Sequence, residues 1–287
     1  MQTERLARAI GGPVVRATPF TGRGYTPARR MIAELADGTT VFAKQGVNEY
    51  TAGELRREFA NYQRLQGFFM PVFVGWDDDG GVEPILVLED LSTADWPPPW
   101  TVDRVVQVLD TIGVIARQPV PGGVVELEEE WVGGGWQAVA DDPEPFLSLG
   151  MCTDAWLDRT LPTLLDASAG ARLKGDQLVH LDVRSDNLCF AGDRTVFVDW
   201  NHACVANPEV DRAFFLPSMV SEGGPPPEEV ATVSPEMVAV VAGFFACRAA
   251  LPPVPGGPGV RGVQRAQLTA ALPWAVRALG LPSLGGA

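Results

Sequence analysis

Apolar and polar residues alternate along much of the first third of the chain, a period of two that predicts β-strands. The Asp37-Gly38 pair between two of these runs is a strong hairpin signal. Between positions 49 and 65 the period becomes helical. The residues that recur on one face there are Leu55, Phe59, Tyr62 and Leu65. Strands are expected at 13–17, 30–35, 41–44, 71–75 and 84–88. The pattern therefore predicts a five-stranded antiparallel sheet with one helix inserted after its third strand.

After a proline-rich connector at 96–100, helical patterns predominate. Ser234 followed by Pro235 is a clear helix start, with serine as the N-cap and proline at the first helical position. Pro273 predicts a kink in the last helix. Helices are expected at 102–117, 153–165, 235–248 and 264–279, and residues 122–135 are expected to be irregular. A strand-rich part followed by a helical part indicates an α+β protein with two lobes.

The bulk properties narrow the possible partners. The chain has 287 residues, 46% of them apolar, and a formal net charge of −14. This acidic balance argues against nucleic acid as the main partner, because phosphate backbones are bound through an excess of Lys and Arg. It would favour a cationic substrate, although on charge alone acidity that only maintains solubility is the preferred explanation.

Cysteine spacing and hydropathy bear on the compartment. The four cysteines, at 152, 189, 204 and 247, form no C-x-x-C pair, so neither a zinc site nor a disulfide framework is indicated. The first residues do not resemble a secretory signal, and no apolar stretch approaches the length of a membrane span. We expect a reduced cytoplasmic protein with no membrane partner.

The segment from His180 to Asp199 carries the most specific chemistry. It reads H-x-D-x-x-x-x-N, followed by an apolar run and a second Asp, which is the order of the catalytic and metal loops of protein kinases. In phosphoryl transfer the protein positions the acceptor hydroxyl, accepts its proton and holds Mg²⁺ on the phosphates. Asp182 suits the first two tasks. Asn187 and Asp199 offer the oxygen ligands that Mg²⁺ prefers.

Two features of the strand-rich part fit the same chemistry. Lys44, one of only two lysines, ends a predicted strand and could reach the phosphates of a nucleotide. Glu58 could orient it, with Glu54 as the competing candidate; a solvated lysine is the alternative. Gly22 and Gly24 lie in a turn that could approach phosphates through backbone N–H groups, although a glycine-rich turn is more often only a hairpin.

The ordered set of motifs resembles the aminoglycoside phosphotransferase family, small-molecule kinases with the bilobal protein-kinase-like fold. The resemblance spans most of the chain. It rests on Lys44, Glu58, residues 86–91, residues 180–187, residues 198–200 and residues 207–211. It implies a nucleotide-binding lobe at 1–91 and a catalytic and acceptor-binding lobe at 92–287.

The resemblance also implies residue roles and cofactors. Asp182 would be the catalytic base, Asn187 and Asp199 would bind Mg²⁺, and Lys44 would bind the phosphates of ATP or GTP. The purine would lie against Glu89, Asp90 and Leu91. His180 would brace the loop, as would Asp211, while Arg184 could contact a phosphate and Asp186 would face solvent or cap a backbone N–H.

Departures from protein kinases indicate a small acceptor. Trp200-Asn201 replaces Phe-Gly after the metal-binding Asp, no A-P-E segment follows, and the glycine-rich loop is shortened. The short stretch between Asp199 and Asp211 leaves no room for a peptide-displaying activation segment. A protein kinase is therefore disfavoured.

The acceptor is the least determined feature. An acidic stretch at 126–144 could bind the amines of an aminoglycoside or be a solvated surface. Trp131, Trp136 and Trp156 could form a wall for sugar or nucleoside rings, or belong to the core. We expect an antibiotic hydroxyl, as in resistance kinases. The alternatives are a metabolic kinase of choline, homoserine or sugar type, and a non-catalytic nucleotide-binding protein.

Overall fold

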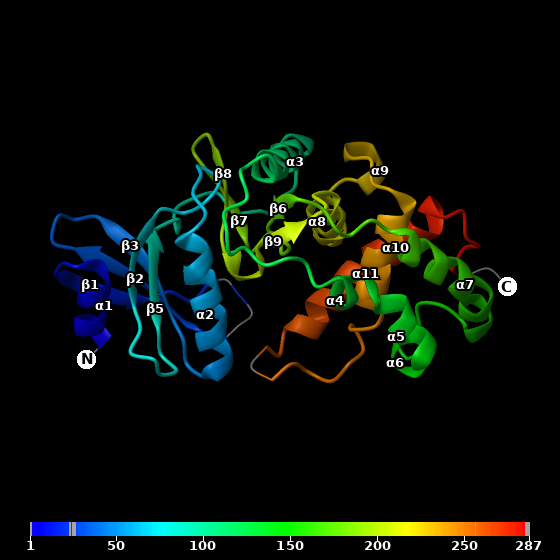
Figure 1. The fold of residues 1–287 in the computed structure, drawn as a ribbon, viewed down its shortest axis with the longest axis horizontal. Coiled ribbons are helices and arrows are strands. Elements are labelled where there is room, and N and C mark those ends of the chain that lie inside the picture. Colours follow the sequence, from blue (N-terminus) through cyan, green and yellow to red (C-terminus); the bar gives the residue numbers. More distant parts are fainter. Residues whose placement is uncertain (1, 23, 25–26, 256, 285–287) are drawn as a thin grey trace. The chain divides into compact units, whose positions relative to one another are not determined.

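The structure is a computed structural model that describes residues 2–22, 24, 27–255 and 257–284. The chain forms two compact units, which are described separately. The first consists of Met1–Pro97, Pro121–Val124 and Ser185–Ala203, and the second of Pro98–Val120, Val125–Arg184 and Cys204–Ala287. Figure 1 shows the elements of both units. The functional lobe boundary between residues 91 and 92 stays a prediction.

The first unit is built on the expected five-stranded antiparallel sheet, with strand order β1-β2-β3-β5-β4. Its strands are β1 (Val14–Pro19), β2 (Arg29–Leu35), β3 (Thr40–Gln45), β4 (Phe73–Asp77) and β5 (Ile85–Glu89). The helix after the third strand is α2 (Glu49–Tyr62). The α+β fold class is thus confirmed, although β4 begins two residues later than the alternation predicted.

One face of this sheet packs on a helix that the sequence analysis missed, α1 (Gln2–Ile10). Leu6 and Ala9 join one apolar cluster with strand residues. The strand members of that cluster are Met31, Ala33, Val41, Ala43, Ile85 and Val87. At Gly75 of β4 a side chain would collide with the carbonyl of Ala9, so the glycine permits the close approach. Lys44, one residue beyond Ala43, points to the opposite face.

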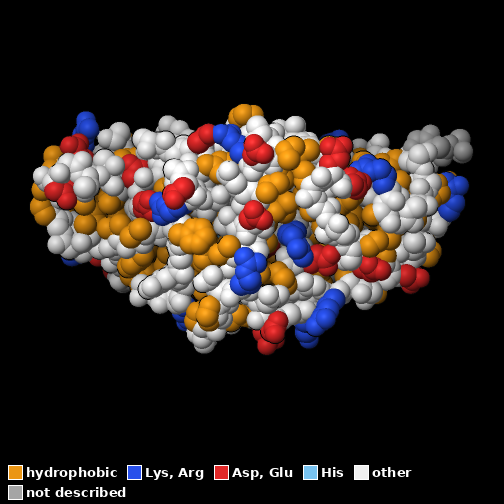
Figure 2. All heavy atoms as spheres, turned by 90° about the horizontal axis from the view of Figure 1, so that it is seen from above, with side chains coloured by type: hydrophobic (Ala, Val, Ile, Leu, Met, Phe, Trp, Pro, Cys, Tyr) orange, Lys and Arg blue, Asp and Glu red, His pale blue; other side chains and the backbone are white. Residues whose placement is uncertain are grey.

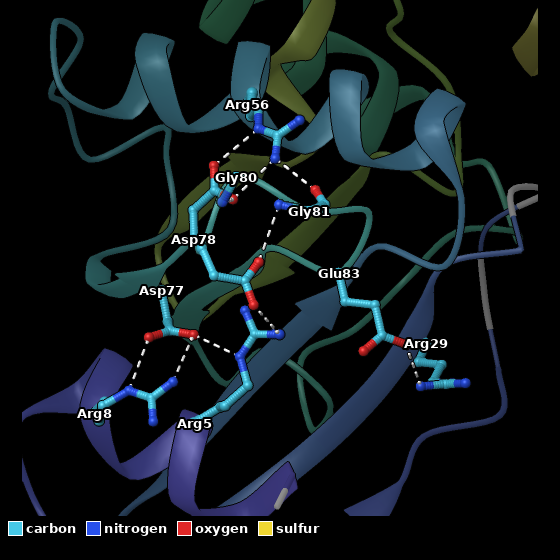
Figure 3. A network of polar contacts seen from close by, with 10 residues as sticks. Arg5, Arg8, Arg29, Arg56, Asp77, Asp78, Gly80, Gly81 and Glu83 are labelled. Carbon is cyan, nitrogen blue, oxygen red and sulfur yellow. Dashed lines mark hydrogen bonds and ion pairs between the residues drawn. The ribbon is translucent and has the colours of Figure 1, made fainter.

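Arginine–aspartate contacts connect α1 and α2 with the turn between β4 and β5 (Figure 3). Arg5 Nε lies 2.7 Å and Arg8 Nε 3.2 Å from carboxylate oxygens of Asp77. Arg56 of α2 binds both oxygens of Asp78, at 2.8 and 2.9 Å, in the two-pronged geometry that suits a guanidinium. The turn is therefore attached to both helices of the unit.

Helix α2 is fixed at its start and along its length. Asn48 and Thr51 form a capping box, which satisfies backbone donors at the first turn. Farther along, Phe59 stacks on Trp76 of β4 with ring centroids 4.4 Å apart and planes 4° from parallel. These contacts set the rotation of α2, and hence the direction of Glu58, its most buried carboxylate at 1% exposure.

A segment from the later part of the chain completes this unit. It contains the hairpin β7 (Leu188–Ala191) and β8 (Arg194–Phe197), then a 3₁₀ turn, Trp200–His202. Phe197 N donates to Phe69 O at 2.8 Å. Asn61 of α2 donates to the carbonyl of Trp200 at 2.7 Å, and the Trp200 ring is fully buried. Asp199 is thereby set beside α2.

The second unit is mainly helical. Its helices are α3 (Val102–Ala116), α4 (Glu129–Gly133), α5 (Gly135–Asp141), α6 (Glu144–Leu147), α7 (Asp154–Gly170), α8 (Glu209–Ser221), α9 (Pro227–Val230), α10 (Pro235–Ala246) and α11 (Val260–Ala278). A small antiparallel pair, β6 (Gln177–Val179) and β9 (Cys204–Ala206), lies among them. The Ser234 N-cap is confirmed, since its hydroxyl accepts from Met237 N. The expectation of irregular structure at 122–135 was wrong from Glu129 onward.

Helix α10 is the centre of this unit, packed against α4, α5, α7, α8 and α11 (Figure 1). Every residue from Met237 to Ala246 is buried, as expected for a helix that is apolar on all sides. Gly135 and Gly243 let α5 approach it closely, because a side chain at Gly135 would meet the Gly243 backbone. Trp136 packs on Gly243 and donates from its indole to Ala239 O at 2.8 Å.

Figure 2 shows how charged side chains are distributed on one face of the molecule. On the face in Figure 2, basic and acidic side chains are interspersed rather than gathered in one patch. No disulfide joins the four cysteines, all of them described; Cys189 and Cys204 are buried and the other two are half-buried. Within the described part of the chain, no helix is long and apolar enough to cross a membrane.

Candidate active site

The first unit contains an open cavity lined by β2, β3, β5, α2 and the segment after Ser185. Its apolar wall includes Phe20, Phe42, Leu88, Leu91, Trp96 and Val198. Its charged or amide-bearing lining residues are Arg30, Lys44, Glu58, Glu89, Asp186, Asn187 and Asp199. One wall can therefore receive a planar apolar ring, while the rest presents groups suited to phosphates and a cation.

Lys44 is the central cation of this cavity. Its Nζ lies 3.0 Å from Glu58 Oε2 and 2.7 Å from Asp199 Oδ1. Burial alone would lower the pKa of Lys44, but the adjacent Asp199 and Glu58 carboxylates raise it above its ordinary value. The ammonium is therefore charged at neutral pH and fixed in direction. Of the two glutamates considered, Glu58 makes the ion pair, whereas Glu54 contacts Arg57 and Asn201.

Asn187 and Asp199 line the same cavity. Val198 N donates to Asn187 O at 2.8 Å, which joins the two segments just before Asp199. Asp199 itself adopts φ 65°, a left-handed conformation that is uncommon for a residue other than glycine and often marks a functional site. One amide and one carboxylate fit Mg²⁺, which is usually bound by one or two side chains together with phosphates and water. The described residues contain no cluster of three or more His, Cys, Asp or Glu side chains suited to a metal.

Two cavity residues were not assigned to the site from the sequence. Arg30 was not considered, yet it lies directly opposite Lys44 in the β2–β3 ladder and lines the cavity. No local motif could have revealed it, because the pairing of Arg30 with Lys44 depends on the cross-strand register. Asp186 was expected at the surface or as a backbone cap, but it also lines the cavity.

The expected purine-binding segment follows β5. Glu89 N donates to Val72 O at 2.8 Å, and the Glu89 carboxylate accepts from Val72 N and pairs with Arg194. Leu91 O accepts the indole N–H of Trp96 at 3.0 Å. Glu89 and Leu91 line the cavity. Asp90 is not among its described lining residues, and its carboxylate accepts from Ser92 N at 2.9 Å.

The expected phosphate loop is only partly described. Gly24 lines the cavity and has φ 92°, a conformation that favours glycine. Gly22 is exposed and is not among the described lining residues. Arg23 and Tyr25, the other residues of this predicted turn, lie outside the described residues.

The expected catalytic loop begins in the second unit, after β6. Asp211 of α8 accepts from His180 N and Leu181 N, each at 2.7 Å, and is only 1% exposed. Burial raises the pKa of Asp211 to about 6 against the lowering effect of these two N–H groups. The buried His180 ring accepts from Asp182 N at 3.3 Å. Arg184 Nε lies 3.4 Å from Asp182 Oδ1. The start of the loop, next to Asp182, is thus anchored on Asp211.

The tryptophans and the acidic stretch that were considered as acceptor-binding residues differ in solvent exposure. Trp136 and Trp156 are 0% and 1% exposed and belong to the core. Trp131 is 43% exposed and lies against Arg248, whose guanidinium carbon is 5.5 Å from the Trp131 ring centroid. Within the acidic stretch, Glu129 pairs with Lys174 at 2.9 Å, and most of the remaining carboxylates are exposed.

Comparison with known proteins gives a family and a fold. The model of the phosphotransferase enzyme family matches residues 28–234. No curated protein matches the chain. Among solved structures, a thermostable mutant of an aminoglycoside phosphotransferase in complex with AMP-PNP and hygromycin B aligns with TM-score 0.61 and 13% identity, over 97% of each chain.

Two further solved structures show the same fold at similarly low identity. Spectinomycin phosphotransferase in complex with ADP and spectinomycin aligns with TM-score 0.60 and 13% identity, over 94% of this chain and 96% of that one. A choline kinase from Streptococcus pneumoniae aligns with TM-score 0.57 and 12% identity, over 97% of each chain. These neighbours share the protein-kinase-like architecture.

Proposed function

Because the chain belongs to the phosphotransferase enzyme family, we propose that it transfers the γ-phosphate of ATP or GTP to a hydroxyl group of a small molecule. The observation that carries this proposal is the placement of Lys44 between Glu58 and Asp199 in a cavity that Asn187 also lines. A buried ammonium beside a carboxylate and an amide is the arrangement that nucleotide phosphates and their metal require.

The residue roles follow from this arrangement. Lys44 binds nucleotide phosphates, with Glu58 directing its ammonium group. Asn187 and Asp199 hold Mg²⁺, which when bound neutralises charge on the phosphates. The purine lies along the apolar wall near Leu88 and Leu91. Gly22 and Gly24 belong to a turn that approaches the phosphates, and Glu89 and Asp90 flank the purine-binding backbone.

Asp182 is the proposed base. As the acceptor oxygen attacks the γ-phosphorus, a new O–P bond forms and the bond from the γ-phosphorus to the β,γ-bridging oxygen breaks. The hydroxyl proton passes to the Asp182 carboxylate, and the nucleoside diphosphate leaves with the bond's electron pair. His180 and Asp211 keep the loop in position, while Arg184 balances the carboxylate charge and is available to the transferred phosphoryl group.

An antibiotic is the acceptor class that we propose first, which would make this a resistance kinase. Two of the structural neighbours were solved with hygromycin B and spectinomycin, and both compounds carry hydroxyl groups. The choline kinase aligns with a TM-score close to those of the two antibiotic kinases. This supports the alternative, a metabolic kinase acting on an amino alcohol or sugar. The spacing of the four cysteines, which indicates no disulfide framework, supports the proposal of a reducing, cytoplasmic location.

The first test is Asp182→Asn with purified protein. We expect turnover to fall by about 10³-fold or more, because general base and positioning functions are lost together, while the nucleotide dissociation constant changes little. Asp176→Asn, an exposed position in the same unit, is the matched control. Full turnover by the Asp182 variant would rule out its role as base.

Acceptor identity is tested by coupled detection of nucleoside diphosphate across a panel of aminoglycosides, other hydroxylated antibiotics, choline, homoserine and sugars. Turnover with one compound class would assign the acceptor. Mg²⁺-dependent nucleotide binding without turnover on any compound would instead favour a non-catalytic nucleotide-binding protein.

A further inference from the structure

We propose that Arg30 is a second phosphate-binding cation of the nucleotide site, acting beside Lys44. This inference rests on the proposed nucleotide-dependent function and names a residue of that site which the kinase motifs do not contain.

The sheet register brings Arg30 and Lys44 together. They are directly paired in the antiparallel ladder of β2 and β3, and directly paired residues project from the same face of a sheet. The next pair along, Met31 and Ala43, projects to the opposite face and packs in the cluster with α1. Both basic side chains therefore enter the cavity, and both line it.

The cavity lining carries more carboxylates than basic groups, so a second cation would help it to bind phosphates. Arg30 and Lys44 are its only basic groups among the described lining residues, which also include Glu58, Glu89, Asp186 and Asp199. Lys44 is already in contact with two of these carboxylates. A triphosphate entering this site meets repulsion from the same carboxylates, so an additional cation lowers the electrostatic cost of binding.

The environment of Arg30 is electrostatically coupled to the proposed metal site. Burial lowers the pKa of Arg30, while the carboxylates of Asp199, Glu58 and Asp186 act in the opposite direction. An arginine remains protonated under such conditions. Its guanidinium carries five N–H donors, and Nη1 donates to Ala28 O at 3.1 Å. The planar group can bind two phosphate oxygens at once.

The backbone at Gly24, which also lines the cavity, lies close to the Arg30 guanidinium. A Cβ built on Gly24 would collide with Arg30 Nη2 and Cζ, and the positive φ of Gly24 also disfavours a side chain. The glycine is therefore explained by close approach of the backbone to Arg30.

The neighbouring arginine provides a matched control. Arg29 belongs to the same strand, but its side chain is 55% exposed and its Nη1 lies 3.3 Å from Glu83. It does not appear among the described lining residues of the cavity. Removing the charge of Arg29 or of Arg30 changes the net charge of the protein by the same amount. A difference in nucleotide affinity between the two variants therefore depends on where the arginine lies, and not on net charge.

The experiment is calorimetric titration of Arg30→Met, Arg29→Met and the wild-type protein with nucleoside, mono-, di- and triphosphate in the presence of Mg²⁺. Adenine or guanine compounds are used, whichever the wild type binds. For Arg30→Met we expect triphosphate affinity to fall about 10- to 100-fold, the range for losing charge-assisted hydrogen bonds. Nucleoside affinity should change less than about 2-fold, and Arg29→Met should match the wild type.

Thermal melting of each free protein checks folding, and Arg30→Gln provides the same series if Arg30→Met does not fold. An equal loss of affinity for nucleoside and triphosphate, or no loss for either, would overturn the role of Arg30. A wild-type protein that binds none of the nucleotides would instead overturn the proposed function itself, so the two failures are distinguishable.

Discussion

At the scale of single residues, the site depends on buried charged groups, each of which has two polar partners. Lys44 has two carboxylate partners, and Asp211 receives two backbone N–H groups of the loop that carries Asp182. Buried polar groups of this kind are costly to leave unmatched. Conservative substitutions at these positions should therefore reduce stability and activity more than the same substitutions at the surface.

Asp211→Asn tests the bracing of the proposed catalytic loop. An amide presents one oxygen and one NH₂ group where the carboxylate presented two acceptors, so one backbone N–H loses its partner. We expect the free energy of unfolding to fall by about 1–3 kcal/mol and kcat to fall at least about tenfold, with nucleotide affinity nearly unchanged. Urea unfolding, steady-state kinetics and calorimetry measure the three quantities.

The exposed Asp158→Asn variant on α7 serves as the control for Asp211→Asn. Unchanged kcat in a folded Asp211→Asn protein would contradict the bracing role.

Site residues could be predicted from the sequence where a motif specified both the residue types and their spacing. The H-x-D-x-x-x-x-N pattern led to Asn187 and Asp199, both of which line the cavity. Glu58 was preferred over Glu54 and does pair with Lys44. Arg30 was missed because its position depends on cross-strand register, a contact between residues distant in sequence that no local motif encodes.

At the scale of elements, the clear periodicities predicted the sheet and α2, whereas short helices escaped detection. Helix α1 has nine residues, and its charged side chains, such as Arg5 and Arg8, obscure the small apolar face formed by Leu6 and Ala9. Helices α4 to α6 are shorter still and lie in a stretch rich in glutamate and glycine. Tertiary packing, rather than local propensity, stabilises such elements.

The contacts around the β4–β5 turn predict a pH-dependent stability (Figure 3). Hydrogen bonds from Arg5 and Arg8 hold the pKa of Asp77 below its usual value despite burial, and the hydrogen bond from Arg56 lowers that of Asp78. A carboxyl group whose pKa is lower in the folded state stabilises the protein above its unfolded pKa. That contribution is lost as the pH falls through the lowered folded values, below about 4.

The double variant Asp77→Asn and Asp78→Asn should therefore be less stable than wild type at pH 7, with the difference shrinking as the pH is lowered toward 3. Thermal melting followed by circular dichroism between pH 3 and 7 measures this. Asp193→Asn, exposed in the β7–β8 turn of the same unit, should follow the wild-type curve. A constant gap between the double variant and wild type at every pH would show that these carboxylates do not act through ionisation.

At the scale of the whole molecule, the compact units do not coincide with a single cut in the chain. The cavity is lined by residues from the first hundred positions and by Asp186, Asn187, Val198 and Asp199, all within one unit. The proposed base Asp182 belongs to the other unit, and the boundary falls between Arg184 and Ser185. β7, β8 and the proposed Mg²⁺ ligands belong to this compact unit although they lie far beyond residue 91 in the sequence, a placement that depends on tertiary contacts.

Hydrogen exchange with bound nucleotide tests this organisation. Ligand that binds only the native state suppresses opening of the unit that forms its site, by about 2.7 kcal/mol at a ligand concentration 100 times the dissociation constant. We expect Mg²⁺-nucleotide to slow exchange in β2, β3 and β5 and, to a similar extent, in residues 185–203, because these segments line one cavity. Mass spectrometry of peptides from wild type, with Lys44→Ala as the binding-impaired control, measures the protection. Protection confined to the first hundred residues, with 185–203 unchanged, would mean that the later segment does not share the nucleotide site and would remove Asn187 and Asp199 from it.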